Sequence, residues 1–183
     1  QAGMAIATRL AERDPGNTQW QSDLSLSHTR IGDVLRAQED LPGALRAYQA
    51  GMAIATRLAE RDPGNAEWQR DLSISHERIG DVLRAQGDGP GALRAYQAGM
   101  AIRMSLAERD PGNTQWQRYV LVSRWRLADI HLRLGERAAA RPHAEAALAL
   151  ARDRRARFPD QPQTAADLNA AESLLSRIEA ASQ

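Results

Sequence analysis

The sequence contains no cysteine and no lysine, and aromatic residues make up only 4% of its 183 positions. The absence of cysteine excludes disulfide bonds, thiol catalysis and cysteine-ligated metal sites. The formal net charge is only +1, so the chain has no overall field that would attract nucleic acid or an anionic membrane surface. No apolar run approaches the roughly 20 residues that a membrane-spanning helix needs. We therefore expect a cytoplasmic protein that binds neither nucleic acid nor membrane.

The most informative feature that is present is an internal repeat. Residues 1–48 recur as residues 49–96 with about seven differences, and a third, diverged copy covers residues 97–144. Such a period is typical of stacked helical arrays, in which each unit buries its apolar face against its neighbours. We therefore predict one repeat domain over 1–183, with residues 145–183 forming a half-repeat and a capping helix. Because the chain begins inside a repeat, we expect it to be a fragment of a longer array.

Each unit is predicted to form two long helices. In residues 66–86, apolar side chains such as Trp68, Leu72 and Ile79 recur at the spacing of one buried helical face. Asn65 precedes this segment and is a favourable N-cap residue. A second helix is predicted to start near Pro90, since proline is tolerated in the first turn, and to end at about Arg109. No strand pattern is visible, so the expected fold is all-α.

The C-terminal residues predict one further helix, from a cap at Thr164 to about Ala181. Its apolar side chains lie on one face, and Asp167 lies off that face. One apolar and one polar face are typical of the capping helix that terminal repeats need. Pro142 lies inside the preceding helix and is expected to loosen its first turns. The total is about eight helices.

The second copy carries a set of landmark residues at characteristic spacing: Ile79-Gly80, Leu83, Gly87-Asp88, Ala92, Tyr96 and Gly99. In order and spacing these residues resemble the tetratricopeptide (TPR) motif. His76 stands where the family has tryptophan, and Pro111 comes about two turns later than the family's closing proline. The unit therefore resembles a long-helix TPR variant of 48 residues, similar to arrays in large bacterial signalling proteins. The resemblance implies a right-handed α-solenoid without cofactors, which binds a protein or peptide in a concave groove.

The differences between copies one and two fall on a stripe of the first helix, away from the core face. In TPR arrays this side lines the groove. We therefore predict a partner-binding groove lined by Gln19, Ser22, Thr29, Asp33, Arg36, Glu67, Arg70, Glu77, Asp81, Arg84, Arg118, Trp125, Asp129 and Arg133. The alternative is that the stripe is an exposed surface that varies because nothing constrains it.

Two features of this stripe have alternative interpretations. Leu26, Ile74 and Val122 are apolar in every copy, so they could form an apolar groove floor or contacts between neighbouring first helices. Trp125 could be an exposed anchor for a partner, since tryptophan is common at interface hot spots. It could instead pack against the final helices of the chain.

Catalysis is not expected from this chain. His28 and His76 occupy equivalent positions one repeat apart, and His131 and His143 lack a partner at ligand spacing, so no metal site is predicted. No glycine-rich phosphate loop follows a strand. The remaining alternative to partner binding is a structural one: a spacer, or a scaffold that stacks end to end through the helix predicted at 1–14.

Overall fold

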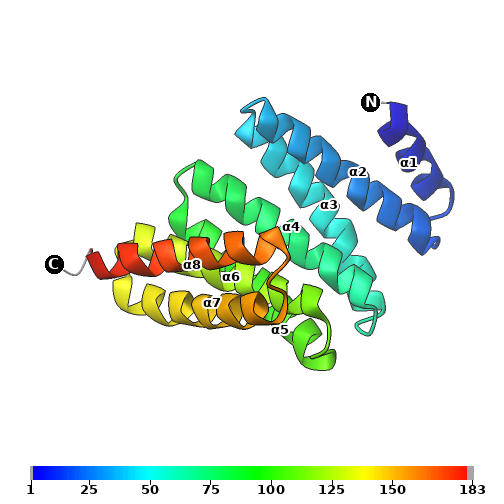
Figure 1. Cartoon of the computed structure of the whole chain (residues 1–183). Coiled ribbons are helices and arrows are strands. Elements are labelled where there is room, and N and C mark those ends of the chain that lie inside the picture. The colour runs from blue at the N-terminus through cyan, green and yellow to red at the C-terminus, as the bar shows by residue number, and fades with distance from the viewer. Residues whose placement is uncertain (1, 181–183) are drawn as a thin grey trace. The chain divides into compact units, whose positions relative to one another are not determined.

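A computed structural model describes residues 2–180, which form eight α-helices and no strand (Figure 1). The helices are α1 (Ala2–Arg13), α2 (Thr18–Ala37), α3 (Leu41–Arg61), α4 (Ala66–Ala85), α5 (Gly89–Arg109), α6 (Thr114–Arg133), α7 (Arg137–Arg157) and α8 (Pro162–Ala180). The predicted all-α fold and the two helices predicted in the second copy are confirmed to within a residue at each end. The predicted ends at Gln1 and at residues 181–183 lie outside the described residues.

The helices divide into two compact units, Gln1–Ile102 and Arg103–Gln183, and the boundary falls inside α5. In the first unit α2 packs against α1 and α3, and α3 packs against α4. In the second unit α7 packs against α6 and α8. Within each unit the successive helices of these pairs run antiparallel (Figure 1). Both units therefore have the hairpin-on-hairpin organisation of an α-solenoid.

Asparagine caps fix where the first helix of each pair begins. The Asn65 side-chain oxygen accepts hydrogen bonds from the backbone N–H groups of Glu67 and Trp68, both at 3.1 Å. Asn17 and Asn113 cap α2 and α6 in the same way. Such a bond satisfies backbone donors that have no partner inside the helix. The predicted cap at Asn65 is confirmed.

The turns that follow α2, α4 and α6 share one backbone conformation. Gly87 and Gly135 have φ angles of 84° and 77°, and Glu39 holds the equivalent place in the first turn with a φ of 63°. Two backbone hydrogen bonds close that turn, from Asp40 to the Leu35 carbonyl and from Glu39 to the Arg36 carbonyl. This is the Schellman motif, in which glycine is preferred because a Cβ disfavours positive φ.

We expect Glu39→Gly to stabilise the protein by about 0.5–1 kcal/mol. Relief of the left-handed conformation contributes about 1–2 kcal/mol, and the greater freedom of glycine in the unfolded chain offsets part of it. The gain should appear as a higher urea midpoint. The reverse change at the equivalent turn, Gly87→Glu, should lower that midpoint. A Glu39→Gly midpoint at or below that of the parent chain would contradict this account of the turn.

The core of the first unit is formed where three helices meet. Ala44 and Tyr48 of α3 pack with Ile79 and Val82 of α4 and with Ala95 of α5. Ala44 and Val82 are 0% exposed and Tyr48 is 1% exposed. Alanine at such a position lets two helix backbones approach closely, and the tyrosine ring fills the space beside it.

Two predictions for the C-terminal unit need correction. Thr164 is not the N-cap of α8, because that helix begins at Pro162 and encloses it. The Thr164 hydroxyl instead donates to the Gln161 and Phe158 carbonyls at 2.8 and 3.0 Å, which ties the start of α8 to the preceding turn. Asp167 is not an exposed polar residue but is 8% exposed.

Candidate functional site

A tyrosine of the second helix and an aspartate of the first helix form a repeated pair. The Tyr48 hydroxyl donates to Asp33 at 2.7 Å, and the Tyr96 hydroxyl donates to Asp81 at 2.7 Å. Each tyrosine ring lies against a glycine of the first helix, where a Cβ would collide with it; at Gly80 that Cβ would lie 2.5 Å from Tyr96 Cε1. Both aspartates belong to the predicted groove, and each accepts a hydrogen bond from a tyrosine of the same chain.

Arginines connect neighbouring first helices through the same aspartates. Arg78 of α4 lies 3.4 Å from Asp33 of α2, and Arg36 of α2 lies 3.8 Å from Asp81 of α4. Ion pairs of this exposure contribute at most about 1 kcal/mol each. Their main effect is to fix the register of α2 against α4. Arg36, Asp33 and Asp81 were predicted as partner-binding residues, and the structure places all three in this crossed cluster.

The second unit has a related arrangement between α6 and α8. Asp129, which is 2% exposed, accepts hydrogen bonds from Arg133 at 2.7 Å and from Arg177 of α8 at 3.4 Å. Arg118 of α6 donates two hydrogen bonds to Asp167 of α8, at 3.1 and 3.4 Å. Three predicted groove residues therefore form hydrogen bonds with other side chains of the same chain: Arg118, Asp129 and Arg133. Asp167 and Arg177 were missed because the contact joins residues about 48 positions apart in the sequence.

Trp125 also contacts α8. Its indole N–H donates to the Ala170 carbonyl at 3.2 Å, and its ring packs against the cluster that contains Ala128, Ala144 and Leu174. The geometry agrees with the interpretation that Trp125 packs against the final helices. One side of the indole nevertheless remains open, because Trp125 also lines a hollow.

That hollow lies between α6 and α8 and has a volume of about 240 Å³. Its walls are mostly apolar, and charged side chains belong to it as well; the lining residues are Leu121, Val122, Trp125, Arg126, Asp167 and Ala170. Val122 is half-buried and packs against the core cluster of Leu121 and Leu148. The hollow is on the first-helix side that the sequence predicted as the groove, and two stripe residues, Val122 and Trp125, line it.

The other predicted groove residues lie nearer solvent. Gln19 and Glu67 are exposed, and Ser22, Thr29, Arg70, Glu77 and Arg84 are half-buried. Most of the bonds described for them are local: Gln19 donates to Asp23 at 3.0 Å, Thr29 to the Ser25 carbonyl at 3.2 Å, and Arg70 to Asp71 at 2.9 Å. Leu26 is 49% exposed whereas its equivalents Ile74 and Val122 are half-buried.

Two histidines of the second unit lie closer together than the sequence suggested. The rings of His131 and His143 stack with centroids 5.6 Å apart and an interplanar angle of 8°. His131 Nδ1 lies 2.7 Å from Glu136, and Arg124 lies 3.2 Å from His143 Nδ1. Burial, followed by the charges of Arg124 and His131, lowers the pKa of His143 below its usual value. The pair joins α6 to α7.

The Tyr48–Asp33 pair predicts how stability depends on alkaline pH. Burial, together with the hydrogen bond to Asp33, raises the pKa of Tyr48 from its ordinary value of about 10 to about 12. The neutral phenol is therefore favoured in the folded state. Its contribution to stability is complete below pH 10 and is lost as the pH rises from 10 through 12.

We expect the urea midpoint of the chain to fall across this pH range, and to fall less for Tyr48→Phe. The difference in tyrosinate absorbance between the two proteins reports the ionisation of Tyr48 directly. In the folded protein that difference should develop with a midpoint near pH 12. A midpoint near pH 10 in the folded protein would show that the phenol is neither desolvated nor bonded to Asp33.

We compared the chain with known proteins to find which folds it resembles. No protein-family model matches the sequence, and no curated protein matches it. The crystal structure of BtubC (BKLC) from P. vanneervenii is similar over 98% of this chain and 69% of that chain, with a TM-score of 0.64 and 15% sequence identity. A de novo designed helical repeat protein, DHR64, aligns over 97% of this chain and 92% of its own, with a TM-score of 0.41 and 13% identity.

The likeness to BtubC concerns the fold alone, because the sequence identity is low. Together with the helix hairpins of both units, it identifies the chain as an all-α helical-repeat protein. None of the helices from α1 to α8 combines the length and apolar character needed to cross a membrane.

Proposed function

We propose that the chain is a non-catalytic protein-interaction scaffold of the TPR kind, built from 48-residue long-helix units. The sequence resemblance to TPR arrays of large bacterial signalling proteins supports this assignment. The observation that carries it is the apolar hollow between α6 and α8, which lies on the first-helix side and is lined by Val122 and Trp125. The partner places an apolar side chain there.

The chemistry of the hollow favours an apolar anchor over a charged one. Leu121, Val122 and the indole of Trp125 provide apolar contacts, and Asp167 is already hydrogen-bonded to Arg118. A site of this kind binds by burying apolar area, and full burial of one large side chain contributes about 1.5–3 kcal/mol. Aromatic and apolar anchors in small pockets commonly dominate the binding energy of an interface.

The charged residues of the predicted groove contribute little to this proposal. Asp33, Asp81 and Asp129 are paired with arginines of the same chain, and Asp33 and Asp81 also accept hydrogen bonds from tyrosines. A partner that displaced those bonds would gain one ion pair at the cost of another. We therefore propose that the partner is recognised by shape and apolar contact, with weak dependence on salt.

Selection from a displayed peptide library tests this function. We expect selected peptides to share one large apolar or aromatic residue, to compete with one another for the chain, and to retain their affinity in high salt. Peptides that share only charged residues, or that lose affinity steeply as salt is added, would contradict an apolar anchor site.

A structural role, as a spacer or as a scaffold that self-associates end to end, is a second candidate function, and one observation favours self-association. Ile6 on α1 and Leu26 and Val34 on α2 are 59%, 49% and 56% exposed. A scaffold that stacks end to end would cover them. Light-scattering mass measured from micromolar to millimolar concentration should then climb, whereas a constant monomer mass rules out self-association.

A further inference from the structure

The contact between α6 and α7 contains two histidines where the preceding copy has an apolar pair. His131 and His143 stand at the positions that Leu83 and Ala95 hold one repeat earlier. Leu83 packs against the core cluster that contains Ala95, so that contact is apolar. In the third copy two stacked imidazole rings take its place, and His131 is 8% exposed while His143 is half-buried. The third copy therefore has, at this place, a contact that protons can charge.

Glu136 binds His131 instead of capping a helix. Its equivalent Asp88 caps the helix that follows, since its carboxylate accepts a hydrogen bond from the Gly91 backbone N–H at 2.8 Å. Glu136 makes no such capping bond to α7, and its Oε2 lies 2.7 Å from His131 Nδ1. An ionised carboxylate can only accept, so Nδ1 of His131 carries the shared proton. Glu136 accepts this bond from a neutral and from a protonated ring alike.

Arg124 imposes the opposite condition on His143. Its Nη1 lies 3.2 Å from His143 Nδ1, and a guanidinium can only donate. The bond therefore requires a lone pair on Nδ1, which protonation removes. Burial, followed by the charges of Arg124 and His131, lowers the pKa of His143 below its ordinary value of 6.5. Because the folded-state pKa is lowered, the stabilisation from neutral His143 is complete above pH 6.5 and is lost as the pH falls below that value.

The charges that face His143 all oppose a proton on it. Within the part of the chain that the structure describes, the charges that act on His143 are those of Arg124 and His131. Three further arginines of the surrounding helices are bound elsewhere: Arg103 of α5 to Ser123, Arg177 of α8 to Asp129, and Arg141 of α7 to Glu145. A proton on His143 therefore breaks one hydrogen bond and adds like-charge repulsion.

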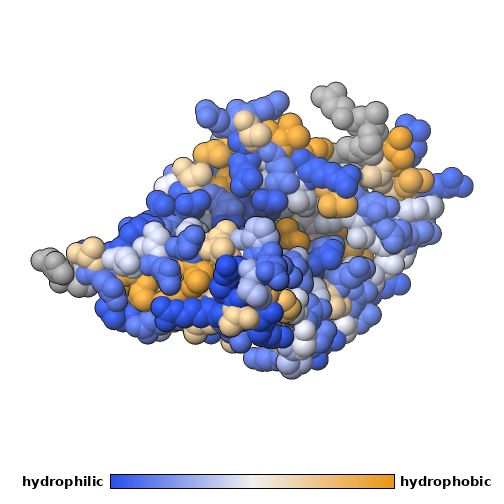
Figure 2. Space-filling view, in the orientation of Figure 1, coloured by the Kyte–Doolittle hydropathy of each residue, from blue (hydrophilic) through white to orange (hydrophobic). Residues whose placement is uncertain are grey.

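The first half of α7 has few other bonds to hold it in place. The helix begins without a side-chain cap, and Pro142 lies inside it, where proline removes one backbone hydrogen bond. On the α8 side, Ala140 and Ala144 pack with Leu174. Figure 2 shows apolar side chains along the line between α7 and α8. Acid therefore changes the α6 side of this segment and leaves its α8 side apolar.

The same segment supports the hollow beside Trp125. Ala140 and Ala144 of α7 belong, with Ala128 and Leu174, to the core cluster against which Trp125 packs. The indole of Trp125 is one wall of the hollow. A displacement of the first half of α7 would therefore reach the hollow through direct packing contacts.

We propose that the cluster of His131, His143, Arg124 and Glu136 is an acid-released latch, which holds the first half of α7 on α6 at neutral pH and loosens that segment, and with it the hollow beside Trp125, in acid. The proton enters at His143 Nδ1 and the bond from Arg124 breaks. Glu136 keeps its bond to His131, so the turn between α6 and α7 stays closed while the helix after it opens. The inference rests on the proposed function for its effect on partner binding.

Residue-resolved hydrogen exchange of the backbone amides tests the latch. Histidine titrates between about pH 7.5 and about pH 5. Over this range we expect the exchange of residues 138–145, corrected for the intrinsic effect of pH, to become about tenfold faster, because a hydrogen bond to a charged group is lost. Corrected exchange rates of residues 138–145 that are equal at the two pH values would overturn the proposal.

His143→Gln and His76→Gln are matched variants. Glutamine at residue 143 can accept the bond from Arg124 through its side-chain carbonyl but does not titrate, so the acid response of α7 should disappear. Burial also lowers the pKa of His76 on α4, so His76→Gln should change the first unit and leave the response of α7 in place. A response of α7 that persists in His143→Gln, or that His76→Gln removes equally, contradicts the latch.

A double variant repeats this test without glutamine. His131→Leu combined with His143→Ala gives α6 and α7 the apolar pair that Leu83 and Ala95 form in the preceding copy. The contact should hold at both pH values, and exchange in α7 should no longer respond to acid. An acid response as large as that of the parent chain would show that the histidines are not its source.

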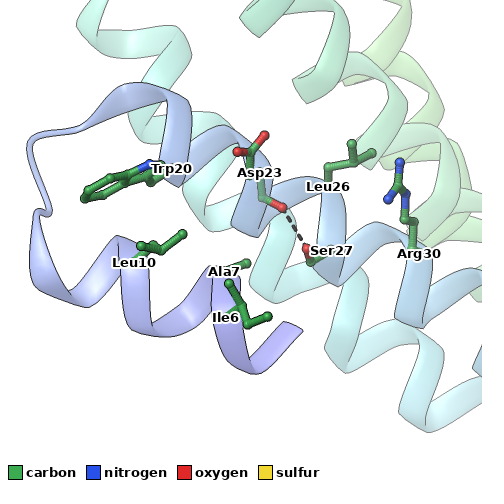
Figure 3. A pocket seen from close by; sticks show the side chains of 8 residues that line it. All are labelled: Ile6, Ala7, Leu10, Trp20, Asp23, Leu26, Ser27 and Arg30. Carbon is green, nitrogen blue, oxygen red and sulfur yellow. Dashed lines mark hydrogen bonds between the residues drawn. The ribbon is translucent and has the colours of Figure 1, made fainter. Parts of the chain in front are cut away.

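Peptide affinity tests the effect on the hollow. The probe is a selected peptide without histidine whose binding Ala170→Arg weakens. That choice excludes peptides bound in another apolar hollow, of about 370 Å³, where Ile6 and Leu10 face Trp20 and which has no histidine among its described lining residues (Figure 3). We expect the affinity to fall at least about tenfold from pH 7.5 to pH 5 in the parent chain and to stay level in His143→Gln.

The outcomes separate the latch from the proposed function. Equal affinity at the two pH values, with α7 exchange still sensitive to acid, would overturn the control of the hollow by the latch. If Ala170→Arg weakens no selected peptide, the proposed function fails, and the exchange measurements still decide whether acid releases α7.

Discussion

Gly80→Ala is expected to destabilise the protein by up to about 2 kcal/mol, although alanine is the better helix former. On propensity alone, the change inside α4 would stabilise by about 1 kcal/mol. The new Cβ would lie 2.5 Å from Cε1 and 2.7 Å from Cδ1 of Tyr96. That ring is 3% exposed and is held by the bond from its hydroxyl to Asp81, so it has no free direction in which to move. Overpacking of this kind costs about 1–3 kcal/mol or more, which outweighs the propensity gain.

The urea midpoint of Gly80→Ala measures this effect, and a double-mutant cycle with Tyr96→Leu assigns it. Tyr96→Leu removes the ring and should destabilise on its own, because it creates a cavity and leaves Asp81 without its phenol donor. Adding Gly80→Ala to that variant should cause no further loss of stability, because the aromatic ring with which the new Cβ would clash is absent. Equal costs in both backgrounds would mean that the clash is not with Tyr96.

Leu127→Ala is expected to have the largest effect on stability, with a loss of about 2–5 kcal/mol. Leu127 lies in the middle of α6 and is 0% exposed, so truncation removes apolar contacts on all sides and leaves a cavity. Leu26→Ala is the control, because it is the same change in another first helix at a side chain that is 49% exposed. Its cost should stay below about 1 kcal/mol.

Chemical denaturation of both variants, followed by circular dichroism, gives the comparison. A similar loss at both positions would indicate that the exposed Leu26 is covered in solution, by self-association or by a segment that the structure leaves apart from it. Measurement at several protein concentrations separates these cases, since only self-association makes the midpoint depend on concentration.

The sequence predicted the helices well because their signals are local. Asn65 marks a start, Gly87 an end, and the spacing of Trp68, Leu72 and Ile79 marks the buried face, all within one short stretch of the sequence. Thr164 was assigned as a cap on the same kind of signal and the assignment was wrong. Helix α8 begins at Pro162, two residues before Thr164. Proline at the start of a helix is as strong a signal as threonine.

The candidate site was harder to predict because its contacts join different helices. Periodicity identified the stripe that contains Asp33, Asp81 and Asp129 but gave no information on what faces it. The structure shows arginines of neighbouring helices facing all three aspartates, and tyrosines of second helices facing Asp33 and Asp81. Asp167 looked like a solvent-exposed residue of α8, since nothing near it in sequence reveals Arg118. Which stripe residues bind a partner stays a prediction.

The most direct test of the interaction scaffold is the affinity of a library-selected peptide for Ala170→Arg and Ala166→Arg. Both alanines are exposed on α8, and only Ala170 lines the hollow beside Trp125. Arginine at residue 170 should close the hollow without disturbing the core and weaken binding at least about tenfold, which corresponds to roughly 1.4 kcal/mol of lost contact. Arginine at residue 166 should leave the affinity unchanged. Equal affinities for the two variants would show that partners do not use this hollow.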